Sequence, residues 1–187
     1  MTTLPASARL HAIERPDAPA VVHPDGTWSW ADLDRRATAI ATALHVRGLG
    51  PGDRIGLALG GTALGIAGMH GVARAGVTAV LVHPRLTARE IADLMTGAGC
   101  TTLVIDPATR IAAPPSVVAL GIDVIATGAA TPTPPATATA PMAAAAPTTE
   151  IVVPTSGTTA RPKLARLPLD RLAASAAAWN AFLPPAS

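Results

Sequence analysis

The sequence predicts an α/β fold in which βαβ units build a parallel sheet. Three short apolar segments, 54–59, 77–82 and 101–105, alternate with two segments of helical periodicity, 62–74 and 87–97. Strands that alternate with helices in this way form a parallel sheet with the helices packed on its faces. The apolar composition of 77–82 is typical of a strand in the interior of such a sheet, where both faces are covered.

Residues 20–30 predict the first element, a β-hairpin. Two strand-like runs, 20–23 and 27–30, flank an Asp-Gly pair, which favours a tight turn. Ser29 then begins a helix, because Asp32 three residues later completes a capping box. The apolar residues of this helix fall on one face, which we expect to be buried: Leu33, Ala37, Ile40, Ala41 and Leu44. A glycine-rich turn ends the helix.

The run from Ile55 to Ala73 carries no charged residue and has about the length that spans a bilayer. The pair Gly60-Gly61 divides it into a strand-like and a helix-like piece, so the sequence favours a β-turn-α unit over a membrane span. Residues 1–19 contain charges and lack the apolar stretch of a signal peptide. We therefore expect a soluble, cytoplasmic protein that does not bind membranes.

The next helix begins at a second capping box. His83-Pro84 ends the strand before it, and Thr87 with Glu90 caps the helix 87–97. Two further strands are expected, over 101–105 and 117–126.

Composition divides the chain into three parts. We expect residues 1–126 to form the α/β subdomain and 127–149 to form a loop or linker, because the latter are almost entirely Ala, Thr and Pro without periodicity. Residues 150–187 are expected to begin a second subdomain. Within it we expect extended runs over 150–153 and 164–167, and a helix over 171–182 that Asp170 caps.

The composition excludes several function classes. A formal net charge of +2, with three Trp, one Phe and no Tyr, argues against a nucleic-acid surface. The single cysteine, Cys100, excludes an internal disulfide and a Cys-based zinc site, and we expect it to be a small buried hydrophobic residue. The five histidines lack the i, i+4 spacing of metal ligands, so no metal site is expected. Ser156 lacks a G-x-S-x-G elbow, which disfavours a hydrolase nucleophile.

The segment from Thr155 to Lys163 is the candidate for chemistry. It holds four hydroxyl side chains and one glycine, and it ends in the only lysine of the sequence. A loop that leaves a strand with such residues can direct N–H groups, hydroxyls and an ammonium group at phosphate oxygens. The segment does not match the Walker pattern, because Lys163 is not followed by Ser or Thr. A polar surface turn whose hydroxyls bond their own backbone is the alternative interpretation.

This segment resembles the phosphate loop of the adenylate-forming superfamily, whose pattern is T-S-G-T-T-G-x-P-K-G. The superfamily comprises acyl-CoA synthetases, luciferases and the adenylation domains of peptide synthetases. Other stretches resemble the same family in the same order: 15–20, 27–33, 48–55, 74–76 and 83–87. Three residues depart from the pattern, since Ala160 and Leu164 stand where the family has glycine and Pro154 stands where it has an aromatic residue.

The resemblance extends from Arg15 to about Leu183, which implies the N-terminal part of the adenylate-forming fold, incomplete, with 150–187 as the truncated start of its nucleotide-binding subdomain. Residues 80–90 are most similar to o-succinylbenzoate–CoA ligases of menaquinone synthesis, and fatty-acyl or aryl-CoA ligases share much of the same sequence in this segment. The implied reaction activates a small-molecule carboxylate with ATP and Mg²⁺ as an acyl-adenylate, and CoA then displaces AMP.

The resemblance also implies roles for the loop residues. Lys163 would stabilise the leaving pyrophosphate, Gly157 would let the backbone approach, and the hydroxyls would cradle the β- and γ-phosphates: Thr155, Ser156, Thr158 and Thr159. No catalytic acid, base or nucleophile is expected in this chain, and the sites for Mg²⁺ and CoA and the adenylation lysine are expected in the remainder of its own chain. The alternative hypothesis is a free-standing, non-catalytic remnant with weak or no nucleotide binding.

Overall fold

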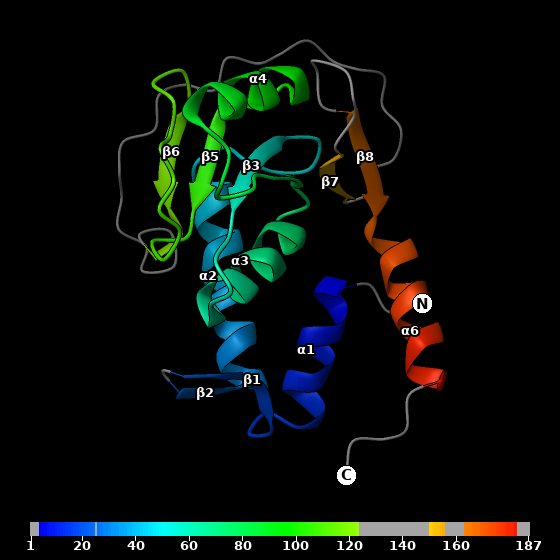
Figure 1. Cartoon of the computed structure of the whole chain (residues 1–187). Helices are drawn as coiled ribbons and strands as arrows, with labels where there is room; N and C mark the ends of the chain where they lie inside the picture. Colours follow the sequence, from blue (N-terminus) through cyan, green and yellow to red (C-terminus); the bar gives the residue numbers. More distant parts are fainter. Residues whose placement is uncertain (1–3, 25, 124–149, 156–162, 183–187) are drawn as a thin grey trace.

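The computed structural model describes residues 4–24, 26–123, 150–155 and 163–182. The described residues form a six-stranded sheet with helices on both faces, beside a small hairpin (Figure 1). The hairpin pairs β1 (Pro19–His23) with β2 (Gly26–Ser29). The strands of the sheet lie in the order β6-β5-β3-β4-β7-β8. Their bounds are β3 (Arg54–Ala58), β4 (Thr78–Leu81), β5 (Thr102–Ile105), β6 (Val118–Gly121), β7 (Glu150–Thr155) and β8 (Lys163–Pro168).

The predicted parallel sheet is confirmed. The first five strands in this order run parallel, and only the edge strand β8 runs antiparallel to its neighbour β7. The helices that connect or flank the strands are α1 (Leu4–Glu14), α2 (Trp30–Val46), α3 (Ala63–Arg74), α4 (Ala88–Ala98) and α6 (Leu169–Phe182).

The two faces of the sheet bury separate cores. On one face Ile55 and Leu57 of β3 pack in a cluster with α2 and α3, including the expected buried stripe of α2. On the other face Ala58 and Val80 pack with α4. Successive strand residues point to opposite faces, which is why both faces of β3 and β4 require apolar or small residues.

Both predicted capping boxes are present. The Ser29 N–H donates to Asp32 Oδ2 at 3.1 Å, and the Asp32 N–H donates to Ser29 Oγ at 3.2 Å. Thr87 and Glu90 make the same reciprocal pair at the start of α4. These local bonds satisfy helix N–H groups that have no intrahelical partner.

Several glycines of the 55–73 run have a packing role. A Cβ on Gly71 would lie 2.6 Å from Cβ and Cγ2 of Ile40, so the missing side chain lets α3 approach α2 closely. The predicted division of this run into strand and helix is confirmed, with Thr62 as the N-cap of α3. Within the described ranges, none of the helices is long and apolar enough to cross a membrane.

Two expectations were wrong in detail, and one element was not predicted. Helix α1 lies within residues 1–19, for which no secondary structure was predicted from the sequence. Strand β6 ends at Gly121, short of the expected 117–126, and Ile122 after it is buried in the α2–α3 core. Helix α6 begins at Leu169, so Asp170 lies in its first turn instead of capping it. The expected linker 127–149 lies outside the described residues.

Candidate functional site

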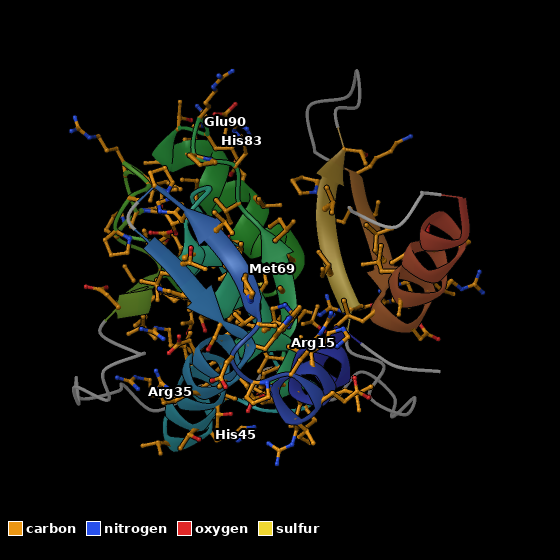
Figure 2. All side chains as sticks on the ribbon, turned by 90° about the horizontal axis from the view of Figure 1, so that it is seen from below. Arg15, Arg35, His45, Met69, His83 and Glu90 are labelled. Atoms are coloured by element: carbon orange, nitrogen blue, oxygen red, sulfur yellow. The ribbon has the colours of Figure 1, made fainter. Side chains whose placement is uncertain are left out.

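The candidate site lies at one edge of the sheet, which we call the carboxyl edge because the parallel strands end there. Strand β7 is parallel to β4, so the chain beyond Thr155 leaves the sheet on the same side as the chain beyond β4. His83, which follows β4, and Glu90 of α4 mark this side in Figure 2, where the arrow of β7 also ends. Ligands of open α/β sheets bind at this edge, where neighbouring loops turn to opposite faces. The helices after β3 and β4, α3 and α4, cover opposite faces.

The structure brings the two ends of the candidate loop together. Strands β7 and β8 form an antiparallel hairpin whose last pair at the carboxyl edge is Thr155 with Lys163. Of the six residues expected to bind phosphate, these two are described and both are exposed. The other four lie outside the described residues: Ser156, Gly157, Thr158 and Thr159.

A side-chain hydrogen bond joins this last pair. The Thr155 hydroxyl donates to the backbone carbonyl oxygen of Lys163, with 3.2 Å between the oxygens. Because Lys163 carries the ammonium group of the candidate loop, this bond holds the backbone from which that side chain extends.

The opposite end of the hairpin is joined by an ion pair. Arg166 Nε lies 2.9 Å from both carboxylate oxygens of Glu150, and its Nη2 lies 2.6 Å from Oε1. Glu150 is 6% exposed, and the hydrogen bonds to its carboxylate raise the pKa of Arg166 above its ordinary value. A bidentate guanidinium binds a carboxylate more strongly than a neutral donor does, and it fixes the geometry of the pair. The hairpin is therefore joined by side chains at both ends.

One departure from the family pattern is explained by the hairpin. Leu164 pairs with Pro154 in the ladder and packs against the core that includes α4. No non-glycine residue among the described ones has a positive φ, so Leu164 needs no conformation that favours glycine. Leu164 is therefore compatible with this hairpin without backbone strain.

Asp106 organises the neighbouring part of the carboxyl edge, and no role was predicted for it. This carboxylate is 2% exposed and follows β5. It accepts hydrogen bonds from the N–H groups of Gly60 at 3.2 Å and Ala108 at 3.0 Å, and from the Thr62 hydroxyl. Asp106 thus ties the turn after β3 to the turn after β5. An acidic residue directly after a buried strand is the sequence signal for such a role.

The other candidates are structural. Burial raises the pKa of the Cys100 thiol to about 11, so the thiol stays protonated and unreactive near neutral pH. Trp28 and Trp30 pack against the α2–α3 core, and the Arg36 guanidinium lies 4.0 Å from the centre of the Trp28 ring. The part of the chain that the structure describes has no group of His, Cys, Asp or Glu residues able to hold a metal ion.

Comparisons with known proteins find a matching family model and several relatives. A family model described as "AMP-binding enzyme" matches residues 9–185. The chain is 32% identical over 160 residues to CymA of Salinispora arenicola, a probable non-canonical nonribosomal peptide synthetase, with 85% of this chain and 2% of that protein covered. It is 32% identical over 112 residues to ScoC of Streptomyces coeruleorubidus, a fatty acid–[acyl-carrier-protein] ligase, with 57% of this chain and 20% of that protein covered.

A solved structure has the same fold. The fatty acyl CoA synthetase of Mycobacterium tuberculosis superposes with a TM-score of 0.75 and 21% identity, covering 97% of this chain and 37% of that chain. The chain thus spans well under half the length of each of these three relatives.

Proposed function

The chain belongs to the AMP-binding enzyme family, the adenylate-forming superfamily, and from that membership we propose that its β7–β8 hairpin binds the polyphosphate of ATP in a carboxylate-activating ligase. Enzymes of this family use ATP. The sheet and its helices match the N-terminal portion of such enzymes.

The pairing of Thr155 with Lys163 at the carboxyl edge is the observation that carries the proposal. It brings the lysine to the base of a loop whose sequence is rich in hydroxyls, on the side of the sheet where α/β proteins bind ligands. The ammonium group is a compact charge with three donors, which suits phosphate oxygens that move during a reaction.

The proposed first step forms a mixed anhydride. A carboxylate oxygen attacks the α-phosphorus of ATP, the bond from that phosphorus to the bridging oxygen of the β-phosphate breaks, and pyrophosphate leaves. Negative charge grows on the β- and γ-phosphates in the transition state, and Lys163 stabilises it there. Ser156, Thr158 and Thr159 supply donors to the same oxygens, and Gly157 lets the backbone approach. A thiol acceptor then attacks the acyl carbon and AMP leaves.

Mg²⁺ would neutralise phosphate charge in this reaction, but the described residues contain no cluster of three or more His, Cys, Asp or Glu side chains that could hold a metal ion. No ligand of Mg²⁺ is therefore assigned to them. CoA is the proposed acceptor, and its site is not assigned to them either.

The narrower proposal concerns which carboxylic acid the enzyme activates. Residues 80–90 support o-succinylbenzoate, as in menaquinone synthesis, whereas the names of ScoC and of the solved synthetase favour a fatty acid. Exchange of labelled pyrophosphate into ATP requires the adenylation lysine, so it is measured on the chain joined to the remainder expected to carry that residue. The acids compared are o-succinylbenzoate, benzoate, a fatty acid and an amino acid. The acid that stimulates exchange identifies the substrate class.

Titration of Mg·ATP into the protein tests the hairpin's role directly. Lys163→Ala should weaken binding by about tenfold or more, as expected when a charged hydrogen-bond partner is removed. Arg9→Ala removes an exposed cation from α1 and serves as the matched control, which should bind like the parent. Equal affinity of Lys163→Ala and the parent would remove the phosphate role of Lys163, whereas weak or absent binding by the parent would support the non-catalytic alternative.

A further inference from the structure

The hydroxyl of Thr155 already donates a hydrogen bond within the protein. A threonine hydroxyl carries one hydrogen, and in this hairpin that hydrogen is donated to the carbonyl oxygen of Lys163 at 3.2 Å. The phosphate oxygens of ATP at neutral pH need donors. A hydroxyl whose only hydrogen points at a carbonyl has none left to give them.

The hydrogen bond between Thr155 and Lys163 lies where it can fix the backbone of the lysine. Thr155 and Lys163 are directly opposed across the two strands, at the last pair before the loop. The lysine side chain is long and loses rotamer freedom when it is held in one place. Because the hydrogen bond fixes the carbonyl group of Lys163, it restricts the position of the Lys163 backbone and the direction in which the lysine side chain leaves the strand.

We propose that Thr155 is a positioning residue that orders Lys163 for the polyphosphate, and that it does not itself bind phosphate. This inference rests on the proposed function of the hairpin, and it changes the role expected for Thr155 from sequence. It predicts that the effect of removing the hydroxyl depends on the presence of the lysine.

A double-mutant cycle separates the two roles. Thr155→Val keeps the shape and strand preference of the side chain and removes the hydroxyl, and Thr155→Ser restores it. Each change is made with Lys163 and with Lys163→Ala, and the dissociation constant for Mg·ATP is measured. Thr27→Val removes the hydroxyl of an exposed strand threonine in β2 and controls for general effects of this substitution.

A positioning role makes the two changes non-additive. A single neutral hydrogen bond of this length predicts that Thr155→Val weakens Mg·ATP binding about two- to tenfold when Lys163 is present. In the Lys163→Ala background the same change should have less than about a twofold effect, because the group it positions is gone. Thr155→Ser and Thr27→Val should bind like the parent.

A direct phosphate ligand gives a different result. Thr155→Val would then weaken binding by the same factor with and without Lys163, and that outcome overturns the proposal. If the parent protein does not bind Mg·ATP, the proposed function fails. The hydrogen bond from Thr155 to the Lys163 carbonyl is then tested only by the chemical-shift measurement below.

The bond can be observed without nucleotide. Because Lys163 is the only lysine of the sequence, labelling with carbon-13 lysine gives the carbonyl signal of this residue alone. Its chemical shift should change in Thr155→Val and remain at the parent value in Thr155→Ser. An unchanged shift in Thr155→Val would show that the hydroxyl does not hold this carbonyl and would overturn the proposal.

Discussion

Glu150 and Arg166 form a bidentate ion pair across β7 and β8, with the carboxylate buried and the guanidinium reaching it from the exposed side of β8. The pair joins the edge strand to the rest of the sheet at the end opposite the candidate loop. A buried carboxylate that loses its partner keeps its desolvation cost, so the two residues depend on each other.

Arg166→Ala should lower the free energy of unfolding by about 2 kcal/mol, because the Glu150 carboxylate is left without its charged partner. Urea unfolding followed by circular dichroism measures the change. Arg171→Ala, on the exposed side of α6, is the control and should have little effect. A stability equal to that of the parent would mean that water replaces the guanidinium without cost.

The capping box of α2 makes the stability of the fold depend on pH in the acid range. The backbone hydrogen bond from Ser29, followed by the hydrogen bond from Arg35, lowers the pKa of Asp32 from 3.8 to about 2. A carboxyl group with a lowered folded-state pKa stabilises the fold above its unfolded value, and this contribution is lost as the pH falls from about 4 to about 2. Asp32→Asn should flatten the stability curve in that window, as measured by thermal unfolding at each pH. A curve as steep as that of the parent would contradict this assignment.

His70 makes stability depend on pH near neutrality in the same direction. Burial, and secondarily the charge of Arg74, lowers its pKa below 6.5, while Asp34 acts in the opposite sense. Its Nδ1 is buried without a hydrogen-bond partner among the described residues. The unfolded chain therefore binds the proton more readily, and stability should fall as the pH drops through 6.5. Urea midpoints between pH 5 and 8 should vary less in His70→Gln, and an unchanged dependence would exclude His70 as the source.

Gly71→Ala should destabilise the protein by about 1–3 kcal/mol, because the added Cβ would lie 2.6 Å from Ile40 and force α3 away from α2. Gly97→Ala in α4 is the matched control, since nothing lies within 4 Å of its added Cβ. That change should be neutral or stabilising by up to about 1 kcal/mol through helix propensity. Thermal unfolding of both variants checks the contrast, and similar melting temperatures would contradict it.

Apart from the parallel sheet, which follows from the alternation of strands and helices, the features predicted correctly from the sequence are local ones. The two capping boxes and the apolar stripe of α2 depend on residues three or four positions apart, so the pattern contains the information. Helix α1 was not predicted because it has no such box, and its exposed face carries Leu10 and Ile13, which obscure the periodicity. Packing against α2 and α3 stabilises it instead.

The parts that could not be predicted are non-local. Asp106 meets Gly60 and Thr62 only because β3 and β5 are neighbours in the sheet, although β4 lies between them in the sequence. The same holds for Glu150 and Arg166, which meet through an antiparallel register. The motif pointed to Thr155 and Lys163, but only the strand pairing shows that the hydroxyl is directed at the lysine's own carbonyl.

The strand order also has a consequence for how the protein folds. Strand β7 pairs with β4 through residues 79 and 151, whereas β3 pairs with β4 and with β5 across shorter stretches of chain. Closing a long stretch of chain costs entropy before its contacts form, so distant pairings form slowly. We expect the β7–β8 hairpin to dock on a sheet that is already assembled. Acquisition of nucleotide affinity would then mark the last stage of folding, and its rate would lag behind the burial of the tryptophans near α2.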